Sequence, residues 1–143
     1  RVHQETKQRA KIITSKLPRG AETILLVEDE AIVRRLAQRT LERQGYKVLE
    51  ADCAKAAIHT SEQYDGEIDL LVSDVVMPGM NGRDLQKDLV KKRPTLKTIF
   101  MSGYGEEVIA HHGVIDQGID FIPKPFRPKA LATKVRQVLD RTD

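Results

Sequence analysis

The chain has 143 residues, a length typical of one domain, with 24 Lys and Arg against 21 Asp and Glu and a formal net charge of +3. Its single cysteine, Cys53, cannot form an internal disulfide, which excludes a disulfide-stapled scaffold and favours a reducing, cytoplasmic location. The longest apolar runs are only as long as a strand and the opening stretch is polar, so no membrane contact and no signal peptide are predicted.

The basic residues are concentrated at the beginning of the chain. Residues 1–20 carry six basic side chains and one acidic side chain, whereas residues 21–143 carry 18 basic and 20 acidic ones. The pI of about 9.0 therefore belongs to a basic leader, and direct nucleic-acid binding by the remainder is not expected. Residues 1–20, which close with Pro18 and Gly20, are interpreted as a linker and residues 21–143 as the domain. A chain that begins at Arg1 is expected to be a piece of something longer.

Beyond the leader, runs of Val, Ile and Leu alternate with segments of helical period. In chain order this pattern predicts a strand at Thr23–Val27, a helix at Glu30–Gln44, a strand at Tyr46–Glu50, a helix at Cys53–Tyr64, a strand at Asp69–Ser73, a helix at Arg83–Lys92, a strand at Leu96–Met101, a helix at Glu106–His112, a strand at Ile119–Ile122 and a helix at Arg127–Arg141. Five strands alternating with five helices indicate an α/β fold with a doubly wound parallel sheet, and the size suits the strand order 2-1-3-4-5.

Two residues near helix starts have structural interpretations of their own. Asp29 precedes the first predicted helix and is able to cap it. Cys53, early in the second predicted helix, is interpreted as a small packing residue.

Ligands of a doubly wound sheet bind beyond the carboxyl ends of the strands, at the switch in strand order. There the sequence places Glu28 and Asp29 after the first strand, Asp74 after the third, Ser102 after the fourth and Lys124 after the fifth. Three carboxylates in one crevice repel one another unless a cation joins them, and Mg²⁺ (or Mn²⁺) prefers oxygen ligands of this kind.

Carboxylates with a metal ion, a lysine and a hydroxyl are the parts needed to transfer a phosphoryl group onto an aspartate. Asp74 is expected to be the nucleophile, because the third strand lies between the first and the fourth in the proposed order.

Four segments resemble the motifs of the receiver domain of two-component response regulators. They are Val27-Glu28-Asp29-Glu30, Asp74-Val75-Val76-Met77-Pro78-Gly79-Met80-Asn81-Gly82, Met101-Ser102-Gly103-Tyr104 and Phe121-Ile122-Pro123-Lys124-Pro125-Phe126. The resemblance covers about residues 21–141, and four motifs in this order are a specific signal. The sequences at Glu22–Glu30 and Phe100–Tyr104 look like receivers at the C-terminus of hybrid sensor histidine kinases.

The resemblance implies a role in a phosphorelay, with Asp74 as the phosphoacceptor. A histidine kinase or a histidine phosphotransfer domain would donate the phosphoryl group from a phosphohistidine. Asp29, Asp74 and the backbone carbonyl of Val76 would ligate Mg²⁺ directly, and Glu28 mainly through water. Lys124 would pair with the phosphoryl group.

The resemblance also implies a switch. Ser102 would bind a phosphoryl oxygen and move on activation, and the rotamer of Phe121 would follow it. A cis peptide bond is implied between Lys124 and Pro125. The partner-binding face would consist of the fourth predicted helix, the fifth strand and the fifth helix.

Two departures from the family pattern affect these expectations. Ser102 stands where Thr is more frequent, which loosens the expected coupling to Phe121. Val76 and Tyr104, two positions beyond the acceptor and the hydroxyl, carry no carboxylate or amide that could orient an attacking water. We therefore expect phospho-Asp74 to hydrolyse slowly on its own.

The residues by themselves leave other functions open. As an isolated domain the chain is expected to assist its own phosphorylation and dephosphorylation without being an enzyme with a separate substrate. The alternatives are a free-standing single-domain response regulator and, in other classes, a flavodoxin-like electron carrier, a metal-dependent phosphohydrolase or a DNA-binding module. The acidic residues after the first strand would repel a flavin phosphate, and Val76 occupies the position where such hydrolases have a second Asp.

Overall fold

The computed structural model describes residues 19–103 and 120–141. The strands are β1 (Thr23–Val27), β2 (Lys47–Ala51), β3 (Leu70–Asp74), β4 (Lys97–Ser102) and β5 (Asp120–Pro123). The helices within these ranges are α2 (Ala31–Arg43), α3 (Ala54–Gln63), α4 (Gly82–Lys92) and α6 (Pro128–Leu139). The helix expected at Glu106–His112 and most of the leader lie outside the described residues.

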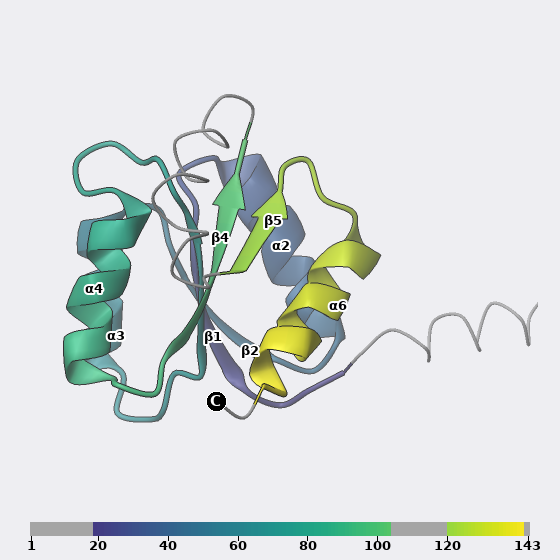
Figure 1. Ribbon diagram of the computed structural model, residues 1–143, viewed down its shortest axis with the longest axis horizontal. Coiled ribbons are helices and arrows are strands. Elements are labelled where there is room, and N and C mark those ends of the chain that lie inside the picture. The colour runs from purple at the N-terminus through teal and green to yellow at the C-terminus, as the bar shows by residue number, and fades with distance from the viewer. Residues whose placement is uncertain (1–18, 104–119, 142–143) are drawn as a thin grey trace, which may run out of the picture.

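All paired strands are parallel, and the sheet order is β2-β1-β3-β4-β5. The doubly wound order predicted from the sequence is therefore confirmed. In Figure 1, α3 and α4 cover one face of the sheet, and α2 and α6 cover the other.

The core forms two layers because successive residues of a strand point to opposite faces of the sheet. Ile24 and Leu26 of β1 pack in the layer with α2 and α6, whereas Leu25 and Val27 pack in the layer with α3 and α4. All four side chains are fully buried, and each contributes about 1.5–3 kcal/mol by leaving water. Such burial on both faces explains why the β1 sequence is apolar without alternation.

Strands β2 to β5 each begin and end one residue later than the sequence pattern predicts. Asp74 pairs with Met101 in the ladder between β3 and β4, and Ser102 pairs with Pro123 between β4 and β5. Backbone pairing in β3 and β4 thus extends to a polar residue beyond the apolar run, and a prediction from hydrophobicity misses that residue. As a result, Asp74 and Ser102 are the last residues of their strands.

The helix starts correct two expectations. The N-cap residue of α2 is Glu30 rather than Asp29, and no side chain caps this helix, because the Asp29 carboxylate lies with two other acidic groups instead. Cys53 is the N-cap of α3, where its Sγ accepts a 3.4 Å hydrogen bond from the Ala56 N–H.

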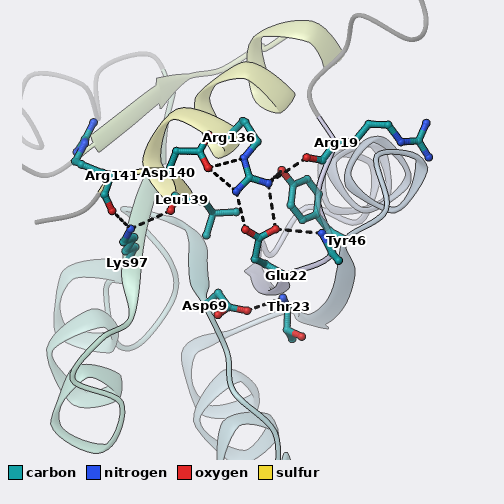
Figure 2. Close-up of polar contacts among 11 residues, drawn as sticks. Arg19, Glu22, Thr23, Tyr46, Asp69, Lys97, Arg136, Leu139, Asp140 and Arg141 are labelled. Carbon is teal, nitrogen blue, oxygen red and sulfur yellow. Dashed lines mark hydrogen bonds and ion pairs between the residues drawn. The ribbon is translucent and has the colours of Figure 1, made fainter.

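An ion-pair network ties α6 to the beginning of β1, at the amino ends of the strands (Figure 2). Arg136 Nη2 lies 2.6 Å from Glu22 Oε2 and 2.8 Å from Asp140 Oδ1, and Nη1 donates to the Arg19 carbonyl oxygen. Lys97 of β4 donates to the Leu139 carbonyl oxygen at the end of the same helix. Within the described residues, no helix is long and apolar enough to cross a bilayer.

Candidate functional site

The side chains of Asp74, Glu28 and Lys124 meet at the carboxyl ends of β3, β1 and β5. Lys124 Nζ lies 2.6 Å from Asp74 Oδ1 and 2.9 Å from Glu28 Oε1. The Glu28 carboxylate is fully buried, the Asp74 carboxylate is 2% exposed, and Lys124 is 15% exposed. One ammonium group therefore joins two carboxylates that water scarcely reaches.

Asp29 completes an acidic cluster with these residues. One carboxylate oxygen each of Glu28, Asp29 and Asp74 lies within 4.8 Å of the others, with Asp29 on the exposed side. Glu30, which follows, lies at the edge of the site, 3.9 Å from Lys124 Nζ. Strand order thus brings together residues separated by as many as 96 positions in the sequence.

The pKa values reflect crowding and burial. Burial and, after it, the neighbouring Glu28 carboxylate raise the pKa of Asp74 to about 8, although Lys124 acts to lower it. Burial also acts to raise the pKa of Asp29, but hydrogen bonding to Glu28 and Asp74 outweighs it and the pKa lies below its ordinary value. Burial disfavours the charged form of Lys124, but Asp74 and Glu28 overcome this and raise its pKa, so it remains an ammonium ion.

The residues present fit a divalent cation with oxygen ligands. Asp74 Oδ1 is buried and forms a close ion pair with the Lys124 ammonium group. Three carboxylates of this spacing, one of them solvent-accessible, suit Mg²⁺, which binds few carboxylates and keeps several waters. Glu28, Asp29 and Asp74 are the side chains able to hold it.

The loop after β3 is folded closely against the acceptor strand. The Val75 N–H donates to the Met101 carbonyl oxygen, and the Gly82 N–H donates to the Val75 carbonyl oxygen at 2.7 Å. A Cβ atom on Gly82 would lie 2.0 Å from the Asp74 carbonyl oxygen, so this position requires glycine. Val76, between these contacts, is 46% exposed beside the site.

Ser102 is the last residue of β4, and Phe121 lies within β5. Ser102 is 3% exposed at the end of β4, one residue beyond the partner of Asp74 in the ladder. The Lys124 N–H donates to the Ser102 carbonyl oxygen at 2.7 Å, and the Lys124–Pro125 peptide bond is cis, as the resemblance implied. Phe121 is half-buried, with its ring centroid 6.3 Å from that of Phe100. Tyr104 lies outside the described residues.

Arg34 of α2 contacts the site but was not recognised from the sequence. Its Nη1 donates a 2.7 Å hydrogen bond to the Glu28 carbonyl oxygen. The residue belongs to the arginine-bearing side of the first predicted helix, a pattern that also describes an ordinary solvated face. One signal could have identified Arg34. It is a long hydrogen-bond donor one turn into a helix, and that helix directly follows acidic residues at the end of a strand.

Comparison with known proteins identifies the family of this chain. The profile of the family described as "Response regulator receiver domain" matches residues 24–136, which include the strand ends described above. The chain belongs to this family.

Among curated proteins, the receiver is 45% identical over 124 residues to the sensor kinase CckA of Brucella abortus. It is 34% identical over 119 residues to the aerobic respiration control protein ArcA of Escherichia coli strain K12. These matches span 87% and 83% of the chain, but only 13% of CckA and 49% of ArcA.

Solved structures give the same assignment. The receiver domain of the hybrid histidine kinase CckA is 39% identical, with a TM-score of 0.69 over 82% of this chain and 99% of that one. A CheY-like receiver domain protein from Methanospirillum hungatei is 29% identical, with a TM-score of 0.71 over 85% and 95%. The predicted family and fold are therefore confirmed, and the similarity extends to the receiver of a hybrid kinase.

Proposed function

We propose that this receiver accepts a phosphoryl group on Asp74 from the phosphohistidine of a histidine kinase or a histidine phosphotransfer domain. The observation that carries the proposal is the placement of the buried Asp74 carboxylate between the Lys124 ammonium group and the acidic pair Glu28 and Asp29. A buried carboxylate beside a cation and further metal ligands is what a nucleophilic aspartate requires.

In the transfer, an Asp74 carboxylate oxygen forms a bond to phosphorus while the bond from phosphorus to the donor imidazole breaks, leaving its electron pair on nitrogen. Lys124, which already contacts Asp74 Oδ1, stabilises the negative charge of the phosphoryl oxygens. Asp29, Asp74 and the Val76 carbonyl are proposed to hold Mg²⁺ directly, and Glu28 through water; the ion would supply further positive charge during the transfer. Because Glu28 Oε1 contacts Lys124, Glu28 also holds the lysine toward the acceptor.

The signal is proposed to leave the site through Ser102 and Phe121. The acyl phosphate carries about two negative charges in place of the one carboxylate charge, together with new acceptor oxygens that the Ser102 hydroxyl can engage. Movement of Ser102 would change the environment of Phe121, because their strands are adjacent in the sheet. The responsive surface is then β5, α6 and the segment 106–112, which lies outside the described residues.

The donor is proposed to dock on α2 beside the site. A cavity of about 380 Å³ has Val33 and Leu36 of α2 on one side and Lys124, Pro125 and Phe126 on the other. Ile32, one turn before Leu36, is 83% exposed. An apolar surface that ends at Lys124 would seat a helix bearing the phosphohistidine.

The parent protein is proposed to be a cytoplasmic hybrid sensor histidine kinase, with a free-standing regulator as the alternative. The support is the 45% identity to the receiver of CckA against 34% to ArcA. The isolated receiver is proposed to have no substrate other than its own phosphoryl donor and to bind proteins rather than nucleic acid, since residues 21–143 carry a small net negative charge.

The test is incubation with Mg²⁺ and phosphoramidate, a small donor with a bond from phosphorus to nitrogen, followed by intact-mass measurement. We expect one phosphate per chain in the wild type, none in Asp74→Asn, and a much slower gain in Lys124→Met. No mass gain in the wild type would contradict the proposal. Ile32→Asp should react normally with phosphoramidate but slowly with a phosphorylated histidine phosphotransfer domain.

A further inference from the structure

Arg34 holds the backbone of the acidic loop between β1 and α2. Its Nη1 lies 2.7 Å from the Glu28 carbonyl oxygen, and its Nε lies 3.4 Å from Glu50 Oε1 of β2. The Arg34 side chain is 19% exposed, so these contacts are partly shielded from water. One guanidinium group therefore links the loop, the helix that follows it and the neighbouring strand.

The other polar atoms of Glu28 are held as well. Its N–H donates to the Ala51 carbonyl oxygen at 3.1 Å, Oε1 accepts from Lys124 Nζ, and Oε2 accepts from the Glu30 N–H at 2.9 Å. The Arg34 contact reaches the carbonyl oxygen of the peptide group between Glu28 and Asp29. Because a peptide group is planar, fixing its carbonyl oxygen also fixes the direction in which the chain enters Asp29.

A further contact at the start of α2 is the hydrogen bond from the Glu30 N–H to Glu28 Oε2. No side chain caps the N-terminus of α2, and Asp29 is exposed. A hydrogen bond from a charged donor is stronger than one between neutral groups, and two of the three nitrogens of the planar guanidinium, Nη1 and Nε, reach two partners at once.

We infer that Arg34 is a positioning residue, which sets the orientation of Glu28 and Asp29 and so the affinity of the acidic cluster for a divalent cation. The inference rests on the metal site of the proposed function. Groups that orient metal ligands without touching the metal typically change metal affinity by about 10-fold to 100-fold when they are removed.

The experiment measures the binding of Mn²⁺ alone by titration calorimetry, with Arg34→Met compared to Arg35→Met. Arg35 is the neighbouring, exposed arginine of α2, so its substitution changes the net charge equally. We expect roughly 10-fold weaker binding for Arg34→Met and a change of less than about twofold for Arg35→Met. Glu50→Gln, which leaves the contact with Glu28 intact, should have a smaller effect than Arg34→Met.

Urea unfolding in EDTA separates positioning from simple stabilisation. Arg34→Lys keeps the charge but cannot reach both partners, so we expect binding to be weakened about threefold in a fully folded variant. Unchanged Mn²⁺ affinity in the Arg34 variants, whether or not their stability falls, would overturn the inference. A wild-type chain that binds no Mn²⁺ would instead overturn the metal site of the proposed function, and with it this role for Arg34.

Discussion

The carboxyl group of Asp74 lies beside two other carboxylates and one ammonium group, and only 2% of the side chain is exposed. Removal from water and the neighbouring Glu28 both penalise its ionised form. At the scale of single residues, the folded site therefore contains unfavourable interactions among its carboxylates. Binding of a cation, alone or together with a phosphoryl group, would relieve them.

The unfavourable free energy of the Asp74 carboxylate should be measurable in the stability of the metal-free domain. Because the pKa of Asp74 is higher in the folded state than in the unfolded chain, the folded state binds the proton more tightly, and stability falls as the pH rises from about 4 toward 8. Asp74→Asn removes the charge and is expected to raise the free energy of unfolding at pH 8 by about 1–3 kcal/mol. Urea unfolding in EDTA measures this, with the exposed Asp65→Asn as a control that should change little; a destabilised Asp74→Asn would contradict the interpretation.

The lifetime of the phosphorylated state depends on Val76. Its side chain is exposed beside the acceptor and offers no group to orient water. Val76→Asn is expected to shorten the half-life of phospho-Asp74 severalfold, as followed by intact mass after removal of the donor. Met80→Asn, at another exposed position of the same loop, should leave the half-life unchanged. Equal half-lives for Val76→Asn and the wild type would count against this role.

The site residues at the ends of strands could be predicted from the sequence, because parallel strands bring their carboxyl ends to one edge of the sheet. Glu28, Asp29, Asp74 and Lys124 were found in this way. Arg34 was not, since its contact depends on a side chain returning from the helix to the preceding loop. The cap assigned to Asp29 was wrong because the sequence does not show which of two polar environments its carboxylate enters.

At the scale of elements, the passage from β3 to α4 shapes the acceptor. Asn81 caps α4 by accepting a 2.8 Å hydrogen bond from the Asp84 N–H. The cap turns the chain so that Gly82 lies directly against the Asp74 carbonyl group. The ends of β3 and β4 were predicted one residue too early because hydrophobicity ends before backbone pairing does.

Two glycines of this loop allow a matched test. Gly82→Ala places a Cβ atom against backbone, so we expect it to lower the free energy of unfolding by more than about 2 kcal/mol and to slow phosphorylation of Asp74. Gly79 has φ of 80° and no atom within 4 Å of an added Cβ atom. Gly79→Ala should cost only about 1–2 kcal/mol through its backbone conformation. If urea unfolding shows a larger loss of free energy for Gly79→Ala than for Gly82→Ala, crowding of a Cβ atom at position 82 is not the main cause of destabilisation.

At the scale of the whole molecule, the two ends of the sheet have different roles. The carboxyl ends of the strands hold the acidic cluster, whereas the amino ends hold the Arg136 network that binds α6 to the start of β1 (Figure 2). The residues proposed for chemistry thus lie at one end of the sheet. The ion pairs that hold α6, a helix of the proposed responsive surface, lie at the other end.

The Arg136 network predicts a dependence of stability on pH. Its hydrogen bonds with Glu22 lower the pKa of that carboxyl group, so their contribution is present above the unfolded pKa of Glu22 and is lost as the pH falls through the folded value. Glu22 is partly exposed, and Glu22→Gln is expected to lower the free energy of unfolding at pH 7 by only about 1 kcal/mol. The difference from the wild type should disappear in strong acid. A difference that persists there would exclude the ion pair as its cause, and Glu42→Gln serves as the exposed control.

The central claim is that Asp74 itself receives the phosphoryl group. The most direct measurement is reduction of the phosphorylated chain with borohydride, which converts an acyl phosphate of aspartate to homoserine, followed by peptide mass spectrometry. We expect homoserine at position 74, formed only when the donor and Mg²⁺ are both present. Reduction at Asp29 or Glu28 instead, or no reduced residue in a chain that had gained the mass of a phosphate, would contradict it.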